Sequence, residues 1–395
     1  MPQNKLKHIL MVAGWFPDEK NPTLGIFVKE HVKSVAAFCK ASVVTLRIEK
    51  TNRLFPKIII AEYAEENYTR YDVIVETPFR KFGLHDYLVK RAYEKAIAYI
   101  KKKNKIDLMH IHVRTHITKI VTAVYAARHI PIVVSEHWSF YQTGILNLPV
   151  EEQKRTIDEV TLWYTNTSIK AILPVSEMLG KIMQERYGVQ NKLITKVGNV
   201  AADCFNVANK QNNIEEVNIV LAAMWTYPKN PMLFVDALKQ LHLRLERKIN
   251  VHWIGSGPQL VEVKKAVDNG LEKINFQFYG LQTKQEIANI FNKADFLVHP
   301  SDSENLPTII AEALCSGLPV LSNRVGGIPE MINDTNGLLA EAKDVLAFAK
   351  ALAFLIENHK DFNTSTIAKK AKELYSQEAI GKQLITIYNR SVDVD

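Results

Sequence analysis

Hydrophobic residues in the first half of the chain fall into short continuous runs, separated by longer segments with helical spacing. The runs have the length of strands and lack polar residues at alternate positions; they are "HILMVA" (8–13), "ASVVTL" (41–46), "DVIVE" (72–76), "IDLMHIHV" (106–113), "PIVVS" (131–135) and "KAILPVS" (170–176). Continuous apolar strands are typical of a parallel sheet that helices cover on both faces. The first half therefore predicts a parallel α/β sheet.

The second half repeats this rhythm after a polar stretch rich in asparagine. Strand-length runs follow at 219–225, 249–255, 274–280, 294–300 and 318–323. The stretch before them has almost nothing to bury, so a linker is predicted at 207–217, between a first domain at 1–206 and a second at 218–376. The predicted fold class is α/β, with two Rossmann-like, doubly wound domains that face a central cleft.

Length and composition agree with two folded domains. At 395 residues the chain exceeds one ordinary core, and 47% hydrophobic and 23% charged residues are usual for a globular protein. No apolar run reaches the roughly 18 residues that span a bilayer, and the first apolar segment is too short for a secretory signal. A cytoplasmic protein is expected. Cys39, Cys204 and Cys315 lie far apart and indicate neither a disulfide framework nor a zinc site.

Charge is distributed unevenly between the halves. Residues 1–200 hold 30 basic and 19 acidic side chains, whereas residues 201–395 hold 20 and 23. The basic half predicts an anionic partner, either a membrane surface or a phosphorylated ligand. No pattern of interleaved basic and aromatic residues accompanies the charge, so nucleic acid is not expected. The lysine run at 101–105 is interpreted as a solvated helix end.

A strand, a polar turn and a helix follow one another at residues 294–317. The strand ends at Pro300, "SDSEN" supplies turn and capping groups, and Pro307 suits the first turn of the helix. Such a helix start is a ready anion site, because its backbone N–H groups are unpaired. An acid within the apolar helix, Glu312, is the residue that this pattern alone does not explain.

The order of residues in and after this segment resembles the donor-binding region of the retaining glycosyltransferases of family 4, which have the GT-B fold. The matching positions are Ser301, Glu304, Pro307, Glu312, Ala313, Gly317, Pro319, Val320, Gly326, Gly327, Pro329, Glu330, Asn336, Gly337 and Leu338. The family signature is a pair of glutamates, matched by Glu304 and Glu312. The resemblance implies a nucleoside diphosphate sugar held by the second domain, with Glu304 on the sugar and Glu312 on the ribose. Carboxylates suit both roles because they accept hydrogen bonds from two hydroxyls at once.

Further positions extend the resemblance through the second domain. Asn305 and Leu306 follow the first glutamate and are expected beside the donor. "WTYPKNP" at 225–231 is similar to the family's diphosphate-binding turn, with Lys229 in the lysine place. Met224 stands where the family usually has an arginine, and Arg324 is a candidate to supply the missing charge. Gly280 and Leu281 match the segment that lies beside the base.

In the first domain the resemblance implies two site residues. Gly25 is expected at a helix start that faces the cleft, and His137 in "VVSEHW" takes the place of the active-site histidine beside the donor sugar. His110 and His112 share a strand face, a pattern that suggests a metal, but no third ligand is evident and packing is preferred. The resemblance also implies that the last helix, 377–391, packs back on this domain.

The predicted function is transfer of a hexose-type unit, with retention, to an acceptor hydroxyl in surface polysaccharide or glycolipid assembly. No cofactor and no metal are expected; the one literal DxD motif is at 393–395. The basic first domain predicts a saccharide or lipid-linked acceptor and peripheral association with the inner face of the membrane. Two alternatives stay open: another GT-B enzyme, such as an epimerase or a phosphorylase, and a non-catalytic module that binds nucleotide sugar, which Met224 makes more credible. The donor sugar, nucleobase, linkage and oligomeric state do not follow from the sequence.

Overall fold

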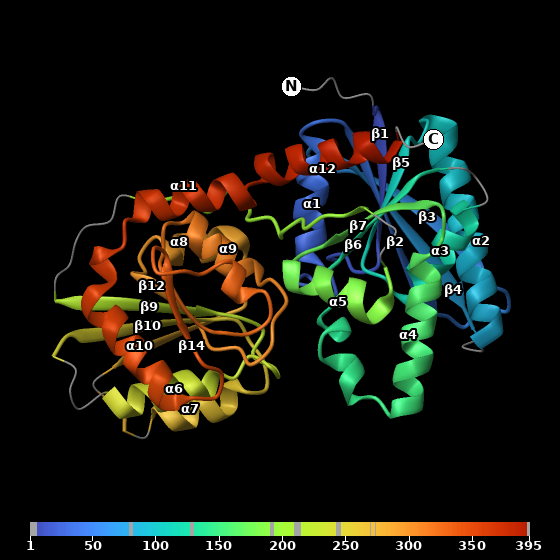
Figure 1. The fold of residues 1–395 in the computed structure, drawn as a ribbon. Helices are drawn as coiled ribbons and strands as arrows, with labels where there is room; N and C mark the ends of the chain where they lie inside the picture. Colours follow the sequence, from blue (N-terminus) through green and yellow to red (C-terminus); the bar gives the residue numbers. More distant parts are fainter. Residues whose placement is uncertain are drawn as a thin grey trace. The chain divides into compact units, whose positions relative to one another are not determined.

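A computed structural model describes residues 6–78, 82–126, 130–189, 193–208, 215–241, 246–268, 270–272 and 274–392. The chain divides into two compact units. The first consists of Met1–Gly198 together with Gln377–Asp395, and the second is Asn199–Ser376. Helices lie on both faces of the sheet in each unit (Figure 1).

The first unit contains an eight-stranded sheet with the order β3-β4-β2-β1-β5-β6-β7-β8. The strands are parallel except for β3, which is antiparallel to β4. Their bounds are β1 His8–Ala13, β2 Lys40–Lys50, β3 Lys57–Ala64, β4 Thr69–Thr77, β5 Leu108–His112, β6 Ile132–Glu136, β7 Ile169–Pro174 and β8 Leu193–Ile194. Every residue of β1, β5 and β6 is buried, which explains their continuous apolar character.

Within the described residues, the α-helices of the first unit are α1 Ile26–Ala36, α2 Phe82–Lys103, α3 His116–Ala126, α4 Val150–Tyr164, α5 Glu177–Tyr187 and α12 Gln377–Val392. Short 3-10 turns lie at Ser139–Tyr141 and Gly144–Asn147. α12 packs against α1, where Gly381 lets the two helices approach closely: a Cβ there would lie 2.3 Å from the carbonyl oxygen of Ser34. The last helix is thus part of the first unit.

The second unit contains a six-stranded parallel sheet with the order β11-β10-β9-β12-β13-β14. Its strands are β9 Glu216–Ala222, β10 Lys248–Ile254, β11 Asn275–Gly280, β12 Phe296–His299, β13 Val320–Asn323 and β14 Gly337–Ala340. Its helices are α6 Pro231–Leu241, α7 Leu260–Val267, α8 Lys284–Phe291, α9 Thr308–Cys315, α10 Val345–Asn358 and α11 Thr364–Tyr375, with 3-10 turns at Ile328–Glu330 and His359–Asp361. Trp225 and Trp253 lie at the centre of its core, with ring centroids 5.1 Å apart.

The α/β class and the two Rossmann-like units are confirmed. In each sheet the strand order reverses beside the first strand of the unit, at β1/β5 and at β9/β12. Ligands of open parallel sheets bind at this switch point, outside the carboxyl ends of the strands. The loops that follow these four strands are therefore the places where a site is expected.

The division between the units differs from the sequence-based one by a few residues. Residues 199–206, which the sequence analysis places in the first domain, belong to the second unit, where Ala201 N–H donates to the Tyr375 carbonyl and Phe205 packs on Phe291. Residues 209–214 of the predicted linker, and the DxD motif at 393–395, lie outside the described residues. No helix in the described ranges has the length and apolar character that crossing a membrane requires.

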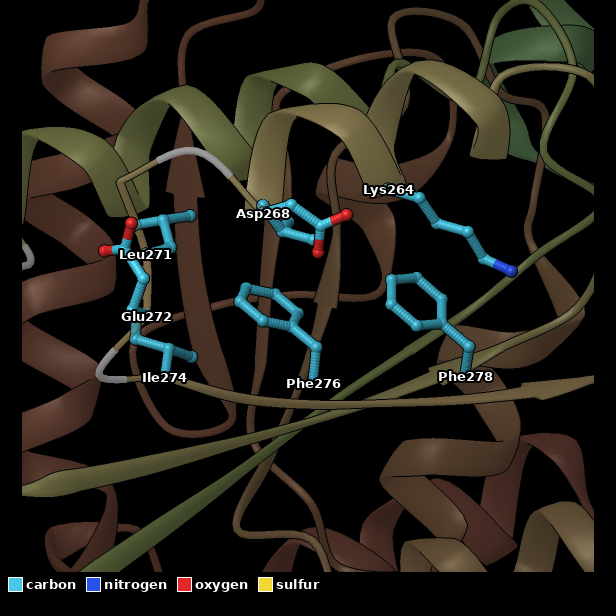
Figure 2. Close-up of a pocket in the computed structure, with 8 residues that line it drawn as sticks. Lys264, Asp268, Leu271, Glu272, Ile274, Phe276 and Phe278 are labelled. Atoms are coloured by element: carbon cyan, nitrogen blue, oxygen red, sulfur yellow. The ribbon is translucent and has the colours of Figure 1, made fainter.

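A surface pocket of about 540 Å³ lies between α7 and the edge strand β11 (Figure 2). Phe276 and Phe278 form one wall, and the Lys264 ammonium lies 5.1 Å from the Phe278 ring centroid. The remaining lining residues are Val267, Asp268, Leu271, Glu272 and Ile274. None of the predicted site residues lines this pocket.

Candidate functional site

The loops after β9 and β12 are bonded to each other at the switch point of the second unit. The Pro228 carbonyl accepts from Asp302 N–H at 2.9 Å and from the Ser301 hydroxyl at 3.1 Å. The Asn230 amide donates to the Asp302 carboxylate at 2.9 Å. Lys229 lies between Pro228 and Asn230. The bonds made by these two residues therefore fix its position relative to the turn that carries Glu304.

Glu304 lies between two nitrogen donors in this turn. Its Oε1 forms an ion pair with the Lys229 ammonium and a hydrogen bond of 2.9 Å with His299 Nε2. Burial alone would raise the pKa of Glu304, but the Lys229 charge and the His299 hydrogen bond hold it at about 2. The carboxylate is therefore ionised at all physiological pH values. His299, the last residue of β12, was not predicted as a site residue from the sequence.

The segment after β13 closes over the same turn. Gly326 has φ +55°, and a Cβ there would lie 1.7 Å from the Glu304 carbonyl oxygen, so only glycine fits. Gly327 N–H donates to the Asn305 carbonyl at 2.8 Å, and the Asn199 amide donates to the Leu306 carbonyl at 2.6 Å. Both residues after Glu304 are buried, and their carbonyls are used to hold the turn.

Glu312 is completely buried in α9, on the helix that follows this turn. Its Oε1 forms an ion pair with the ammonium of Lys284, the first residue of α8. α8 starts with a capping box between Thr283 and Glu286, which fixes the first turn that carries the lysine. The pair explains how an acid is accommodated in an apolar helix, because a buried charge needs an opposite charge close by. Lys284 lies 28 residues away along the chain, so the spacing of residues around Glu312 did not predict it.

The remaining predicted residues of the second unit lie at the same sheet edge. Gly280 ends β11 with φ +69°, has open space where a Cβ would be, and accepts from Gly255 N–H at 2.7 Å; Leu281 beside it is exposed. Met224 is exposed in the loop that follows β9. Arg324 pairs with Glu341 at 3.1 Å, so the structure gives it a partner other than an anionic ligand.

In the first unit, Gly25 stands at the start of α1 with φ +64°. A Cβ there would lie 2.3 Å from the Trp15 carbonyl oxygen, so the loop after β1 passes too close for any side chain. The Gly25 carbonyl accepts from Val28 N–H at 2.9 Å and begins the helix. Close approach of the backbone is thus a structural reason for glycine here, beside the role that the resemblance implies.

His137 follows β6 directly and is partly exposed. Its ring lies 4.5 Å from the Phe27 ring, and its Nε2 is 3.4 Å from His112 Nδ1. Its backbone N–H donates to the buried carboxylate of Glu136 at 3.2 Å. Burial raises the pKa of Glu136, although the Tyr164 hydroxyl donates to that carboxylate.

The structure corrects the expectation that no third imidazole accompanies His110 and His112. His31, His112 and His137 each place one ring nitrogen within 4.8 Å of the others, whereas His110 is occupied by Ser135 and Tyr388. Spacing could not reveal this cluster, because His31 comes from α1 and lies far along the chain from the strand. Packing and hydrogen bonds, as expected, account for His110 alone.

Comparison with known families identifies the chain. Residues 52–200 match the model described as "Glycosyltransferase Family 4", and residues 215–358 match "Glycosyl transferases group 1". The two matches together cover more than half of the chain. It belongs to the group 1 glycosyltransferases.

Two curated relatives extend this assignment. The amylovoran biosynthesis glycosyltransferase AmsK of Erwinia amylovora is 27% identical over 55% of this chain and 56% of its own length. An uncharacterized glycosyltransferase of Methanocaldococcus jannaschii is 26% identical over 80% of this chain and 83% of its own.

Solved structures support the GT-B fold of this glycosyltransferase. Sucrose-phosphate synthase of Thermosynechococcus elongatus has a TM-score of 0.73 at 15% identity, over 97% of this chain and 98% of that one. The Anabaena protein HepE, in complex with UDP, has a TM-score of 0.70 at 14% identity, over 98% and 100%. At these identities the likeness shows the fold alone.

The two sites of the glycosyltransferase offer different chemistry. The second unit places an ionised carboxylate and two ammonium groups at helix starts, which suits hydroxyls and phosphate. The first unit places imidazoles at strand ends. Lys229 and Glu304 are brought together directly, and Glu312 follows on the next helix, while Gly280 and Leu281 share only the sheet edge with them.

Proposed function

We propose that this glycosyltransferase transfers a hexose-type unit from a nucleoside diphosphate sugar to an acceptor hydroxyl with retention of anomeric configuration. The observation that carries the proposal is the Lys229–Glu304 pair at the switch point of the second unit. A free donor offers a diphosphate for the ammonium and vicinal hydroxyls for the carboxylate, so both partners exchange one charged contact for another. Structural neighbours with UDP and with UDP-glucose support a nucleotide-sugar donor.

The reaction breaks the bond between the anomeric carbon and the diphosphate oxygen and forms a bond from that carbon to the acceptor oxygen. The acceptor proton passes to an oxygen of the departing diphosphate on the same face, so no side-chain base is required. Lys229 stabilises the charge that develops on the leaving group, and Glu304 and His137 position the sugar. Glu312 accepts hydrogen bonds from the ribose, in place of its contact with Lys284.

A donor screen tests the binding step. Purified full-length protein is heated with each of a set of nucleoside diphosphate sugars, and a ligand at 100 times its Kd should stabilise the fold by about 2.7 kcal/mol. Product anomers, assigned by NMR after turnover with the donor that binds, then test retention. An inverted product would overturn the retaining mechanism without affecting the donor assignment.

The acceptor is assigned to the first unit, and a lipid-linked saccharide at an anionic membrane surface suits its excess of basic residues. The turn between β2 and β3 supports this assignment, because Leu54 and Phe55 are 84% and 80% exposed there and Lys50, Arg53 and Lys57 flank them. β2 is parallel to β1, so the turn lies at the same sheet edge as the Gly25 loop. Exposed apolar residues beside basic ones are typical of a surface that binds anionic lipid.

Flotation with vesicles that contain anionic lipid tests the membrane assignment. The unmodified protein should float in a salt-sensitive manner, and a Leu54→Ser, Phe55→Ser variant should float less. A matched variant, Leu346→Ser, removes an exposed leucine from the second unit and should float like the parent. The absence of salt-sensitive flotation would argue for a soluble acceptor, whereas equal flotation of all three proteins would show that Leu54 and Phe55 are not the membrane contact.

A non-catalytic module remains the second candidate, and the exposed Met224 in the usual arginine place favours it. Slow hydrolysis of the donor without acceptor would support the enzyme. Tight donor binding with no turnover across acceptors would support the module.

A further inference from the structure

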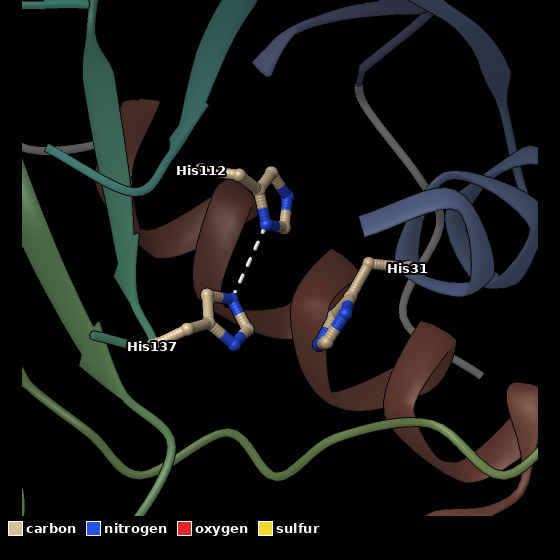
Figure 3. Close-up of side chains that lie close together, drawn as sticks. All are labelled: His31, His112 and His137. Atoms are coloured by element: carbon tan, nitrogen blue, oxygen red, sulfur yellow. Dashed lines mark hydrogen bonds between the residues drawn. The ribbon is translucent and has the colours of Figure 1, made fainter. Parts of the chain in front are cut away.

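The imidazoles of His31, His112 and His137 lie close together in the first unit (Figure 3). His31 comes from α1, His112 ends β5 and His137 follows β6. His31 and His112 are fully buried, whereas His137 is partly exposed. The cluster is thus closed on two sides and open to solvent through the histidine of the loop.

The distance between two of the nitrogens fits a shared ion as well as a long hydrogen bond. His112 Nδ1 and His137 Nε2 are 3.4 Å apart, the contact that Figure 3 marks with a dashed line. Tetrahedral zinc with Zn–N bonds of about 2.0–2.1 Å holds two ligating nitrogens about 3.4 Å from each other. A ring nitrogen of His31 lies within 4.8 Å of the ligand atoms of the other two, so this ring has to move toward them to complete the site.

Both partners of His31 are hydrogen-bond acceptors. Its Nδ1 lies 2.9 Å from the Phe27 carbonyl oxygen, and its Nε2 lies 3.1 Å from the Gly198 carbonyl oxygen. A neutral imidazole has one N–H and can satisfy only one of these acceptors. If Nδ1 donates to Phe27, Nε2 carries no proton, and it becomes a ligand atom once the ring turns away from the Gly198 carbonyl.

His112 offers one nitrogen to the cluster and keeps the other apart from it. Its Nδ1 faces His137 Nε2, and no hydrogen-bond partner for its buried Nε2 is found among the described residues. With Nδ1 as the ligand atom, Nε2 keeps the ring proton.

We propose that His31, His112 and His137 form a binding site for a zinc-class divalent cation, with water as the fourth ligand. Three imidazoles with an open position suit Zn²⁺ in geometry and ligand type. The ion enters past His137, the exposed member. If the proposed function holds, zinc would also inhibit transfer, because it occupies the imidazole assigned to the donor sugar.

A second cluster on the same unit supplies the control. His85, Asp86 and His116 also lie within ligand range, but they are largely exposed and already paired, with His116 Nε2 2.6 Å from Asp86. The background for the experiment is therefore the full chain with His116→Ala, which removes this surface site. Equilibrium dialysis of that protein against zinc chloride should give one bound ion per chain.

The variants His31→Gln and His112→Gln, made in that background, should each weaken zinc binding at least about 100-fold, since even loss of an outer-shell partner costs 10- to 100-fold. His137→Gln changes the exposed member and serves if the buried variants do not fold. Substitution with cobalt adds a spectroscopic test, because four-coordinate cobalt with nitrogen ligands absorbs strongly in the visible range.

The proposal is overturned if the His116→Ala protein binds no zinc, or if folded variants at all three histidines bind it unchanged. These measurements do not depend on catalysis. Zinc binding without any sugar transfer would retain the site and overturn the proposed function, whereas transfer without zinc binding would do the reverse.

Discussion

The two units share one architecture and use it for opposite kinds of electrostatics. At the switch point of the second unit, Glu304 and Lys229 carry fixed charges, and the pKa of the carboxyl is about 2. At the corresponding edge of the first unit, His112 is buried and kept neutral, and its neighbours are imidazoles. The loops after the strands, and not the sheet, therefore decide which chemistry a Rossmann-like unit supports.

The largest expected effect tests the fixed charges. Glu304→Gln removes the anion but keeps the shape, so sugar hydroxyls lose a charged acceptor and Lys229 loses its partner. We expect kcat to fall about 100- to 1000-fold, as when one electrostatic group of an active site is removed. Glu341→Gln is the matched control, because Glu341 is exposed and pairs only with Arg324 among the described residues. Equal kcat in both variants would remove Glu304 from the site.

The second prediction concerns the buried glutamate of the same unit. Glu312→Ala should weaken donor binding about 10- to 150-fold, from the loss of hydrogen bonds to a charged acceptor. Because the change also leaves Lys284 without its ion partner, the free energy of unfolding should fall as well. Calorimetric titration with the donor measures the affinity, and a Lys284→Met, Glu312→Met double variant separates stability from binding. An unchanged dissociation constant would contradict the ribose assignment.

The third prediction compares the glycines of the two sites. Gly25→Ala forces a Cβ against the Trp15 carbonyl and should destabilise the first unit by about 1–3 kcal/mol. Gly280→Ala has the same sign of φ but meets open space, so only the backbone preference is lost, about 1 kcal/mol. Urea unfolding of both variants measures the two losses of stability. A larger loss in Gly280→Ala than in Gly25→Ala would contradict the prediction.

The last prediction concerns the response of the two units to pH. For His31, His110 and His112 the folded pKa is lowered, so the unfolded state binds more protons between the two pKa values. Their stabilising effect is complete above the unfolded pKa of about 6.5 and is lost as the pH falls from there toward the folded pKa of each histidine. Glu304 behaves differently: its contribution is present above about pH 4.3 and is lost only as the pH falls toward 2.

Hydrogen exchange measures this difference unit by unit. Between about pH 7.5 and 5.5, peptides of β1 and β5 should lose more protection than those of β9 and β12, after correction for intrinsic rates. Among the described residues the second unit has His252, whose pKa burial also lowers, so its loss should be smaller rather than zero. Equal losses would show that the buried imidazoles do not set the pH response.

Much of the fold could be predicted because buried strands have a recognisable pattern in the local sequence. Continuous apolar runs indicated the strands that are covered on both faces, and glycines and prolines marked their ends. Glu304 and Glu312 could be recognised for a similar reason, because they lie close together in the sequence, in one turn and in the helix that follows it. The boundary after Gly198 was not, because residues 199–206 pack on the second unit through contacts with Tyr375 and Phe291 that no local pattern encodes.

Partners of the site residues were the part that sequence reasoning could not supply. Lys284 on α8 contacts Glu312 on α9, and His31 on α1 lies beside His112 at the end of β5. Such pairs depend on strand order and helix packing, which spacing does not specify. His299 lay close enough to Glu304 to be noticed, and it was overlooked because a strand-end histidine has no distinctive pattern.

The helix α12 gives the first unit a particular order of assembly. Its Tyr388 is fully buried and hydrogen-bonds to His110 on β5, and Gln377 bonds to Glu30 on α1. During synthesis the ribosome therefore releases all of residues 199–376 before the first unit receives its last helix. The second unit can fold while the first still exposes the surface that α12 covers, so the N-terminal part of the chain is the later of the two to mature and the one that chaperones meet longest.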